Sequence, residues 1–151
     1  MLTRHGAEGD QDGFRKCGKS GCKLCPYTGE AASGKVIKEV EISSSGEKLP
    51  IKGNLTCSTK NILYLVTCTK GDRVCPDRPQ YCGETGKSGE ARFCGHRNSV
   101  TQPCHENTTL PVGDHFRQSG HSVANLVFTP VEKIFSDNVF VRKVRERNLI
   151  N

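Results

Sequence analysis

The chain has 151 residues, the size of a single domain, and only 34% of them are hydrophobic, which limits it to a modest core. It has no stretch of about 18 apolar residues that would cross a membrane, and no apolar segment after Met1 that would direct export. We therefore expect an intracellular protein without a membrane partner. The net charge of +6 is compatible with a polyanionic partner such as nucleic acid, but the charge alone decides little.

Cysteine is abundant, with nine residues in the chain. The odd count and the absence of an export signal favour metal ligation in a reducing compartment over a disulfide framework. A cysteine-rich extracellular interaction domain is the alternative class, and the same two observations oppose it.

The N-terminal third divides into two parts. Residues 1–16 are polar and glycine-rich without periodicity, so we predict a disordered lead-in. We assign residues 17–60 to a zinc-binding hairpin. Within it, apolar positions alternate over 35–56 around a Ser- and Gly-rich turn at 43–46, which indicates one or two strands folded back on each other.

Four cysteines of this part are candidate zinc ligands. Cys22 and Cys25 have the spacing at which two thiolates of one tight turn bind the same tetrahedral zinc ion. The hairpin is expected to return Cys57 to this turn. Cys17 is the simplest fourth ligand, and Cys68 is its rival. Four incidental thiols are the competing interpretation.

The middle of the chain predicts two strands and a helix. Residues 62–66 are apolar and β-branched, which is typical of a buried strand, and a second strand ends at 80–83. Ser88 is a candidate N-cap for a helix that runs to about residue 97. The polar loop 67–79 between the strands carries two cysteines. A second zinc site is conceivable there, although no spacing demands it; its candidate ligands are Cys68, Cys75, Cys104 and His105.

Four polar side chains of these elements are expected on one surface. Period-2 alternation places Tyr64 on the face that also carries Ile62 and Val66. Arg92 and His96 are four residues apart and share one helix face. With Tyr81 on the second strand, these groups can converge beside the small sheet.

The last third predicts a short helix over 112–118, a strand within 124–135 and a final helix over 139–150. Pro130 indicates that this strand is interrupted or lies at a sheet edge. We interpret His115 and His121 as local hydrogen-bonding or capping groups and not as metal ligands.

The final helix is expected to begin after Asp137 or Asn138, either of which can cap it. Phe140 and Val144 are four residues apart and are assigned to the core, whereas the basic positions between and after them face solvent or phosphates.

Six short motifs follow one another along the chain: Leu63-Tyr64; Tyr81-Cys82-Gly83; Glu84-Thr85-Gly86-Lys87-Ser88; Arg92-Phe93-Cys94-Gly95-His96-Arg97; Pro111-Val112 with His115-Phe116 and Gly120-His121-Ser122; and Arg145-Glu146 with Leu149-Ile150. Together they resemble a GIY-YIG nuclease domain, of the type found in Penelope-like retroelements and related eukaryotic proteins. The resemblance covers about residues 17–151, and it rests on the order of the motifs because each one alone is weak.

The resemblance implies an α/β fold: a small, three-stranded, mainly antiparallel sheet flanked by helices, preceded by the zinc-bound hairpin. It assigns residues 61–151 to a nuclease-like domain that is truncated soon after Glu146. It also implies a metal-dependent endonuclease that nicks DNA, with structural Zn²⁺, catalytic Mg²⁺ or Mn²⁺ and a nuclear location.

The resemblance further implies roles for five residues. Glu146 would hold the Mg²⁺ or Mn²⁺ ion, and Arg92 would stabilise the phosphate in the transition state. Tyr64 would activate the attacking water, with His96 as the alternative base, and Tyr81 would hydrogen-bond the phosphate or Tyr64. The competing function is a non-catalytic, nucleic-acid-binding zinc module that retains the nuclease fold.

Overall fold

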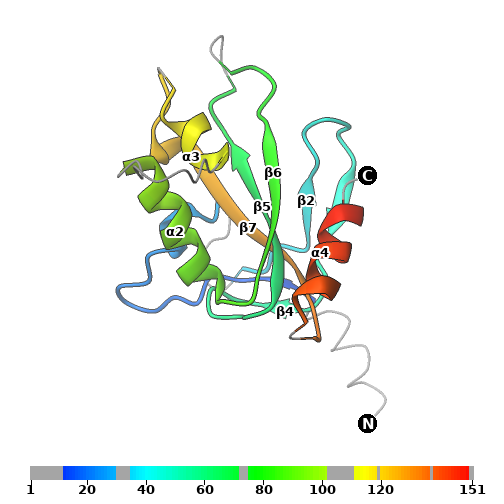
Figure 1. The fold of residues 1–151 in the computed structure, drawn as a ribbon. Helices are drawn as coiled ribbons and strands as arrows, with labels where there is room; N and C mark the ends of the chain where they lie inside the picture. Colours follow the sequence, from blue (N-terminus) through cyan, green and yellow to red (C-terminus); the bar gives the residue numbers. More distant parts are fainter. Residues whose placement is uncertain are drawn as a thin grey trace.

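The protein is a mixed α/β structure in which a three-stranded antiparallel sheet stands between two layers (Figure 1). The computed structural model describes residues 12–29, 35–71, 75–101, 111–118, 120–136 and 138–149. Three α-helices lie in these residues, together with two further small two-stranded sheets. The predicted fold class is thus confirmed at this level.

The central sheet has the strand order β6-β5-β7. It is built from β5 (Ile62–Cys68), β6 (Gln80–Thr85) and β7 (Leu126–Lys133), and β5 pairs antiparallel with both neighbours. Six of the seven residues of β5 are buried, because this strand has neighbours on both sides and layers on both faces. The predicted strand 62–66 is therefore confirmed and extends to Cys68.

Pro130 lies in edge strand β7, opposite Tyr64. The register of the β5–β7 pair shifts between Leu63 and Tyr64, at the same place. Proline has no backbone N–H to donate to a ladder, which restricts it to edges and bulges. The expectation that this strand is interrupted or lies at an edge is confirmed on both counts.

Two helices cover one face of the sheet. Phe93 of α2 (Gly89–Thr101) and Phe116 of α3 (Pro111–Phe116) pack in one apolar cluster with Val66 of β5. The side chain of Ser88 accepts a hydrogen bond of 3.2 Å from the backbone of Ala91, which confirms the predicted N-cap of α2.

A hairpin and the last helix cover the opposite face. The hairpin pairs β2 (Glu39–Glu41) antiparallel with β3 (Lys48–Pro50) around the predicted turn at 43–46. Its Val40 and Leu49 pack in a different apolar cluster from the four cysteines that we assigned to a zinc-binding hairpin. The last helix is α4 (Val139–Asn148), which Asn138 caps by accepting a 2.8 Å hydrogen bond from the backbone of Phe140. Figure 1 shows α4 and the hairpin on the side of the sheet away from α2.

Helix α4 docks through ion pairs more than through apolar side chains. Arg142 donates from Nε to Glu84 of β6 at 2.7 Å, and Arg145 makes a bidentate pair with Glu132 of β7. Both carboxylates are largely buried. The prediction that Phe140 faces the core is wrong, because 67% of this side chain is exposed.

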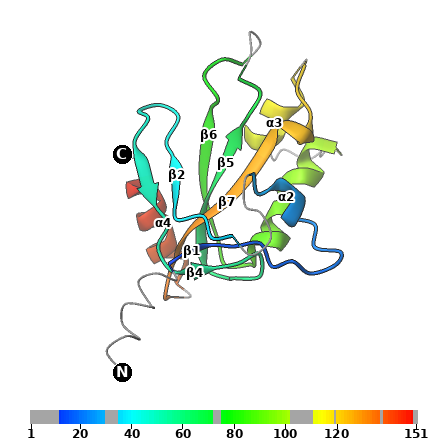
Figure 2. The same cartoon turned by 180° about the vertical axis from the view of Figure 1, so that it is seen from behind.

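The N-terminal segment is also more ordered than predicted. Strand β1 (Gly13–Phe14) pairs parallel with β4 (Asn54–Leu55), and Phe14 is completely buried. The disordered lead-in was expected to reach residue 16, so this part of the prediction is wrong; residues 1–11 lie outside the described residues. Figure 2 shows β1 and β4 together beneath the central sheet.

Two short 3-10 helices complete the described elements: η1 (Cys25–Tyr27) and η2 (Val123–Asn125). Among the described residues, no helix has both the length and the apolar character needed to cross a membrane.

Candidate active site and metal centres

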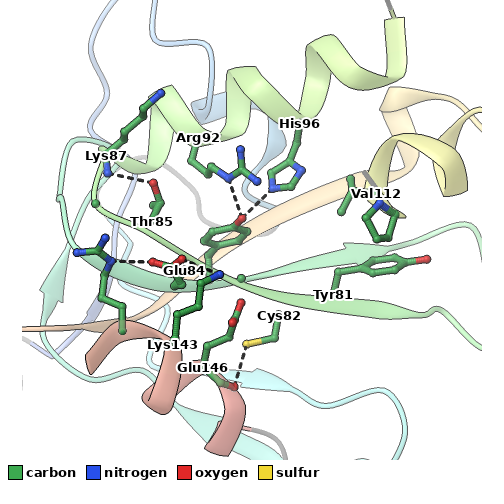
Figure 3. A pocket seen from close by; sticks show the side chains of 15 residues that line it. Tyr81, Cys82, Glu84, Thr85, Lys87, Arg92, His96, Val112, Lys143 and Glu146 are labelled. Carbon is green, nitrogen blue, oxygen red and sulfur yellow. Dashed lines mark hydrogen bonds and ion pairs between the residues drawn. The ribbon is translucent and has the colours of Figure 1, made fainter. Parts of the chain in front are cut away.

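All five residues predicted for the active site line one cavity of about 500 Å³ between α2 and α4, beside strand β6. Arg92 and His96 enter it from α2, and Glu146 enters from α4 on the opposite side (Figure 3). The two tyrosines come from the sheet itself. The structure therefore brings together groups that lie up to 82 residues apart in the sequence, from Tyr64 to Glu146.

Gly83 makes room for Tyr64. The two residues pair across β5 and β6, and a Cβ atom built on Gly83 would lie 2.4 Å from the tyrosine ring and its hydroxyl. Because glycine has no Cβ, the ring crosses over the neighbouring strand and places its hydroxyl at the cavity. The structure thus explains why the motif Tyr81-Cys82-Gly83 ends in glycine.

The Tyr64 hydroxyl has two partners on α2. Arg92 donates from Nε to this oxygen at 3.0 Å, and the hydroxyl lies 2.8 Å from Nε2 of His96. An arginine Nε–H can only donate, so the phenol oxygen accepts there, and its own proton is donated to Nε2 of His96 in the tautomer in which that nitrogen carries no hydrogen. In that tautomer His96 carries its hydrogen on Nδ1, which is buried and has no hydrogen-bond partner among the described residues.

Burial keeps this pair neutral. Burial raises the pKa of Tyr64, and the neighbouring Arg92 offsets only part of this change. Burial and the charge of Arg92 together lower the pKa of His96 to about 4. At neutral pH the imidazole is therefore uncharged, and with its hydrogen on Nδ1 it is an acceptor for the phenolic proton.

Glu146 is the carboxylate of the cavity that remains available for a cation. The other lining carboxylate, Glu84, is held by Arg142 at 2.7 Å and by Lys143 at 3.0 Å. Burial alone would raise the pKa of Glu84, but these two hydrogen-bonded cations outweigh it and lower the pKa. In Figure 3, the carboxylate of Glu146 projects into the space between the two helices.

Tyr81 lines the same cavity but lies at its far end. Its ring packs against His115, with ring centroids 5.8 Å apart. The hydrogen bond to Tyr64 that we expected is not formed, since Arg92 and His96 occupy that hydroxyl. Figure 3 shows the Tyr81 side chain extending away from Arg92 and His96.

The first cysteine cluster contains Cys17, Cys22, Cys25 and Cys57, with all four sulfur atoms within 4.8 Å of one another. The sulfur of Cys25 lies 3.7 Å from that of Cys17 and 3.8 Å from that of Cys57. Zinc bound tetrahedrally at about 2.3 Å separates its sulfur ligands by about 3.8 Å, so the cluster fits this ion. Cys17, and not Cys68, completes the set.

This cluster is joined to the first turn of α2. The carbonyl of Cys57 accepts a hydrogen bond from the backbone of Glu90 at 2.9 Å, and the Glu90 carboxylate accepts one from the backbone of Lys23 at 2.8 Å. Leu24, between two of the cysteines, is completely buried and would lie 3.5 Å from a Cβ on Gly89. The cysteine cluster therefore supports the helix that carries Arg92 and His96.

A second group of candidate ligands contains Cys68, Cys75, His115 and His121, whose ligand atoms also lie within 4.8 Å of one another. The two sulfur atoms are 3.8 Å apart, and the Cys75 sulfur is 3.7 Å from Nε2 of His115. Two thiolates and two imidazoles form a common tetrahedral zinc set.

The structure thus places the two histidines, which we interpreted as local hydrogen-bonding or capping groups, within a second possible ligand set. Of the ligands that we considered for a second site, Cys68 and Cys75 belong to it, whereas Cys104 and His105 lie outside the described residues. The signal available in the sequence was only the presence of two cysteines in one loop and two histidines about 40 residues later.

Comparisons of the chain with protein-family models, with curated proteins and with solved structures give no match. The functional conclusion therefore depends on the geometry of the cavity and the two clusters.

Proposed function

We propose that this protein is a metal-dependent endonuclease that hydrolyses phosphodiester bonds of DNA, nicking one strand, and that it acts in the nucleus. One observation carries the proposal: the Tyr64 hydroxyl is held between Arg92 and neutral His96, with Glu146 facing the same cavity. These groups match what the reaction needs, which is a proton acceptor for water, a cation for the phosphate and a carboxylate for a metal ion.

In the proposed reaction, the Tyr64 oxygen takes a proton from the attacking water while its own proton passes to Nε2 of His96. The water oxygen forms the new bond to phosphorus, and the bond between phosphorus and the leaving oxygen of the sugar breaks. The leaving oxygen keeps the bonding electron pair and takes a proton from solvent. Because both protons move together, Tyr64 never has to exist as a separate phenolate. A phenolate would be unfavourable here, since burial raises the pKa of Tyr64. Both candidate bases therefore take part: Tyr64 accepts the proton of the water, and His96 accepts the proton of Tyr64.

Arg92 has a second role in the proposal. Its Nε is used on Tyr64, but its terminal nitrogens are further donors, and the side chain lines the cavity. A planar guanidinium suits the oxygens of a phosphate and stabilises the charge that develops on them. Glu146 would hold Mg²⁺ or Mn²⁺, which supplies charge neutralisation and a more acidic water molecule when bound.

A non-catalytic nucleic-acid-binding module is the second candidate, and one observation favours it. A histidine with a pKa of about 4 is a weak base, and protonation at Nε2 would leave a buried cation whose Nδ1 has no partner among the described residues. In this alternative, the two clusters would hold zinc and the cavity would bind a phosphate without cleaving it.

The two functions are separated by incubating the protein with supercoiled plasmid, with and without Mg²⁺, and running a gel shift on the same samples. Nicking that requires Mg²⁺ and is lost in Glu146→Gln, with binding retained, supports the endonuclease. Glu41→Gln is the matched control, because Glu41 lies on the hairpin, outside the cavity lining, and its carboxylate pairs with the exposed Lys48 at 3.5 Å. Binding without nicking at any metal concentration supports the module instead.

A further inference from the structure

Large hydrophobic side chains are exposed in one short segment of the described chain. The four that are more than a third exposed are Phe135 at 89%, Phe140 at 67%, Val139 at 52% and Val141 at 37%. Single exposed hydrophobics are normal on a protein surface, whereas four within the seven residues 135–141 favour a binding surface. We call Phe135, Val139 and Phe140 the aromatic surface.

The aromatic surface is not needed to hold its helix. Helix α4 is anchored by Arg142 and Arg145 through their pairs with Glu84 and Glu132. None of the three residues belongs to either apolar core cluster. Packing therefore gives no reason for exposed phenylalanines before this helix, at Phe135, and in its first turn, at Phe140.

The aromatic surface adjoins the candidate active site. Val139 is four residues before Lys143 and seven before Glu146, so the three share one face of α4, and the latter two line the cavity. Phe140 is three residues before Lys143 and lies on the neighbouring, outer face. A ligand that leaves the cavity along α4 therefore meets Val139 and Phe140 of the aromatic surface.

Cations accompany these rings. The ammonium of Lys133 lies 5.9 Å from the centre of the Phe135 ring, and Lys143 stands one turn after Phe140. Aromatic rings beside lysines form the typical contact surface for single-stranded nucleic acid, in which bases stack on the rings and phosphates meet the cations.

The size of the aromatic surface opposes a protein partner. Its exposed area is on the order of 400 Å², given that an aromatic side chain buries about 150–250 Å². A stable protein interface needs about 800 Å² on each side. One or two unstacked bases fit the smaller area.

We propose that the aromatic surface binds unpaired nucleotides next to the cleaved phosphate, so that the preferred substrate is DNA with a bubble, flap or frayed end. This inference rests on the proposed function, since it names the substrate class of the same cavity. Bases inside a continuous duplex are covered by their neighbours, and only unpaired or splayed bases expose a face to Phe135 and Phe140.

The test measures binding by fluorescence anisotropy in the Glu146→Gln background, which keeps the DNA intact without a chelator that would also remove zinc. Three DNAs of one sequence are compared: a continuous duplex, a duplex with a small bubble and a single strand. We expect the bubble to bind about tenfold more tightly than the duplex, in line with base–aromatic stacking. The double variant Phe135→Ser/Phe140→Ser should lose this preference while its duplex binding stays within about twofold.

Two matched variants separate stacking from general hydrophobic contact. The Phe135→Tyr/Phe140→Tyr protein keeps both rings and should keep the preference, whereas the Phe135→Leu/Phe140→Leu protein should lose it. Both positions are exposed, so thermal unfolding should be unchanged in all variants.

Several results overturn the inference. A bubble preference that survives in the serine or leucine variant excludes stacking on these rings. Equal binding of all three DNAs by every protein also overturns it while leaving the nuclease proposal standing. A dimer in solution that the serine variant converts to monomer shows that the surface joins two copies of the chain. Absence of binding to any DNA removes both the inference and the proposed function.

Discussion

Tyr64 and Gly83 form a matched pair across two neighbouring strands, since the tyrosine ring occupies the space that any side chain on Gly83 would fill. The position of the Tyr64 hydroxyl between Arg92 and His96 depends on this space. Gly83 thus positions Tyr64 because it has no Cβ atom in the space that the tyrosine ring fills.

Gly83→Ala should displace the Tyr64 ring and reduce nicking by about 100-fold, because a shift near 1 Å in an active site has effects of this size. The backbone of Gly83 is not in the conformation that favours glycine, so the strand itself should form. Plasmid nicking and thermal unfolding check the two statements together. Unchanged nicking would show that the cavity tolerates a moved tyrosine and would weaken its assigned role.

Glu84→Gln should lower the free energy of unfolding by about 3 kcal/mol, because it leaves the buried guanidinium of Arg142 without its anion. Glu41→Gln is the control: its pair with Lys48 is more than half exposed and should be worth under about 1 kcal/mol. Urea unfolding at neutral pH measures both. Equal effects of the two substitutions would contradict the view that Arg142 anchors α4.

His96 predicts a specific pH dependence of stability. Its pKa is about 4 in the folded protein and about 6.5 when unfolded, so the unfolded state binds the proton first as the pH falls. This contribution to stability is complete above pH 6.5 and declines by about 3 kcal/mol as the pH approaches 4.

Urea unfolding between pH 7 and 4 should therefore show a shallower pH dependence in His96→Gln than in the unsubstituted protein. The nicking rate should also lack a step near pH 6.5 that belongs to His96. Identical slopes for the two proteins would mean that His96 is not the buried, neutral group described above.

Metal analysis should find about two zinc ions per chain in protein purified under reducing conditions, one for each cluster. Cys25→Ser and Cys75→Ser should each reduce the content to about one, whereas Cys94→Ser, outside both clusters, should leave it unchanged. Loss of the first ion should also lower nicking and broaden the NMR signals of α2, because Cys57 and Glu90 connect that cluster to the helix. Full activity in metal-free protein would refute this connection.

The strongly patterned elements could be predicted from the sequence. The apolar run at 62–66 and the cap at Ser88 are local signals, and both gave the correct element with ends that differ by a few residues. The convergence of Tyr64, Arg92 and His96 could also be predicted, since strand and helix periods fix which side chains share a face.

Features that depend on distant partners could not be predicted in this way. Phe14 lies in a polar segment, and only its pairing with β4 places it in the core. Phe140 has the spacing of a core residue, but Arg142 and Arg145 already hold the helix, so the ring stays outside. The possible ligand set with His115 and His121 combines the end of β5, the loop after it, α3 and the segment after α3, which no spacing rule connects.

The attachment of α4 by two arginine–glutamate pairs gives the molecule a natural point of local opening. A helix held mainly by polar contacts belongs to the least stable part of a fold, and its amides exchange with solvent before those of the central strand. Opening of α4 would carry Glu146 away while Tyr64, Arg92 and His96 stay assembled on the sheet and α2. If the protein is the nuclease proposed above, it would then alternate between a form with all of these groups and one that lacks Glu146, and its turnover would depend on how often this short helix is closed.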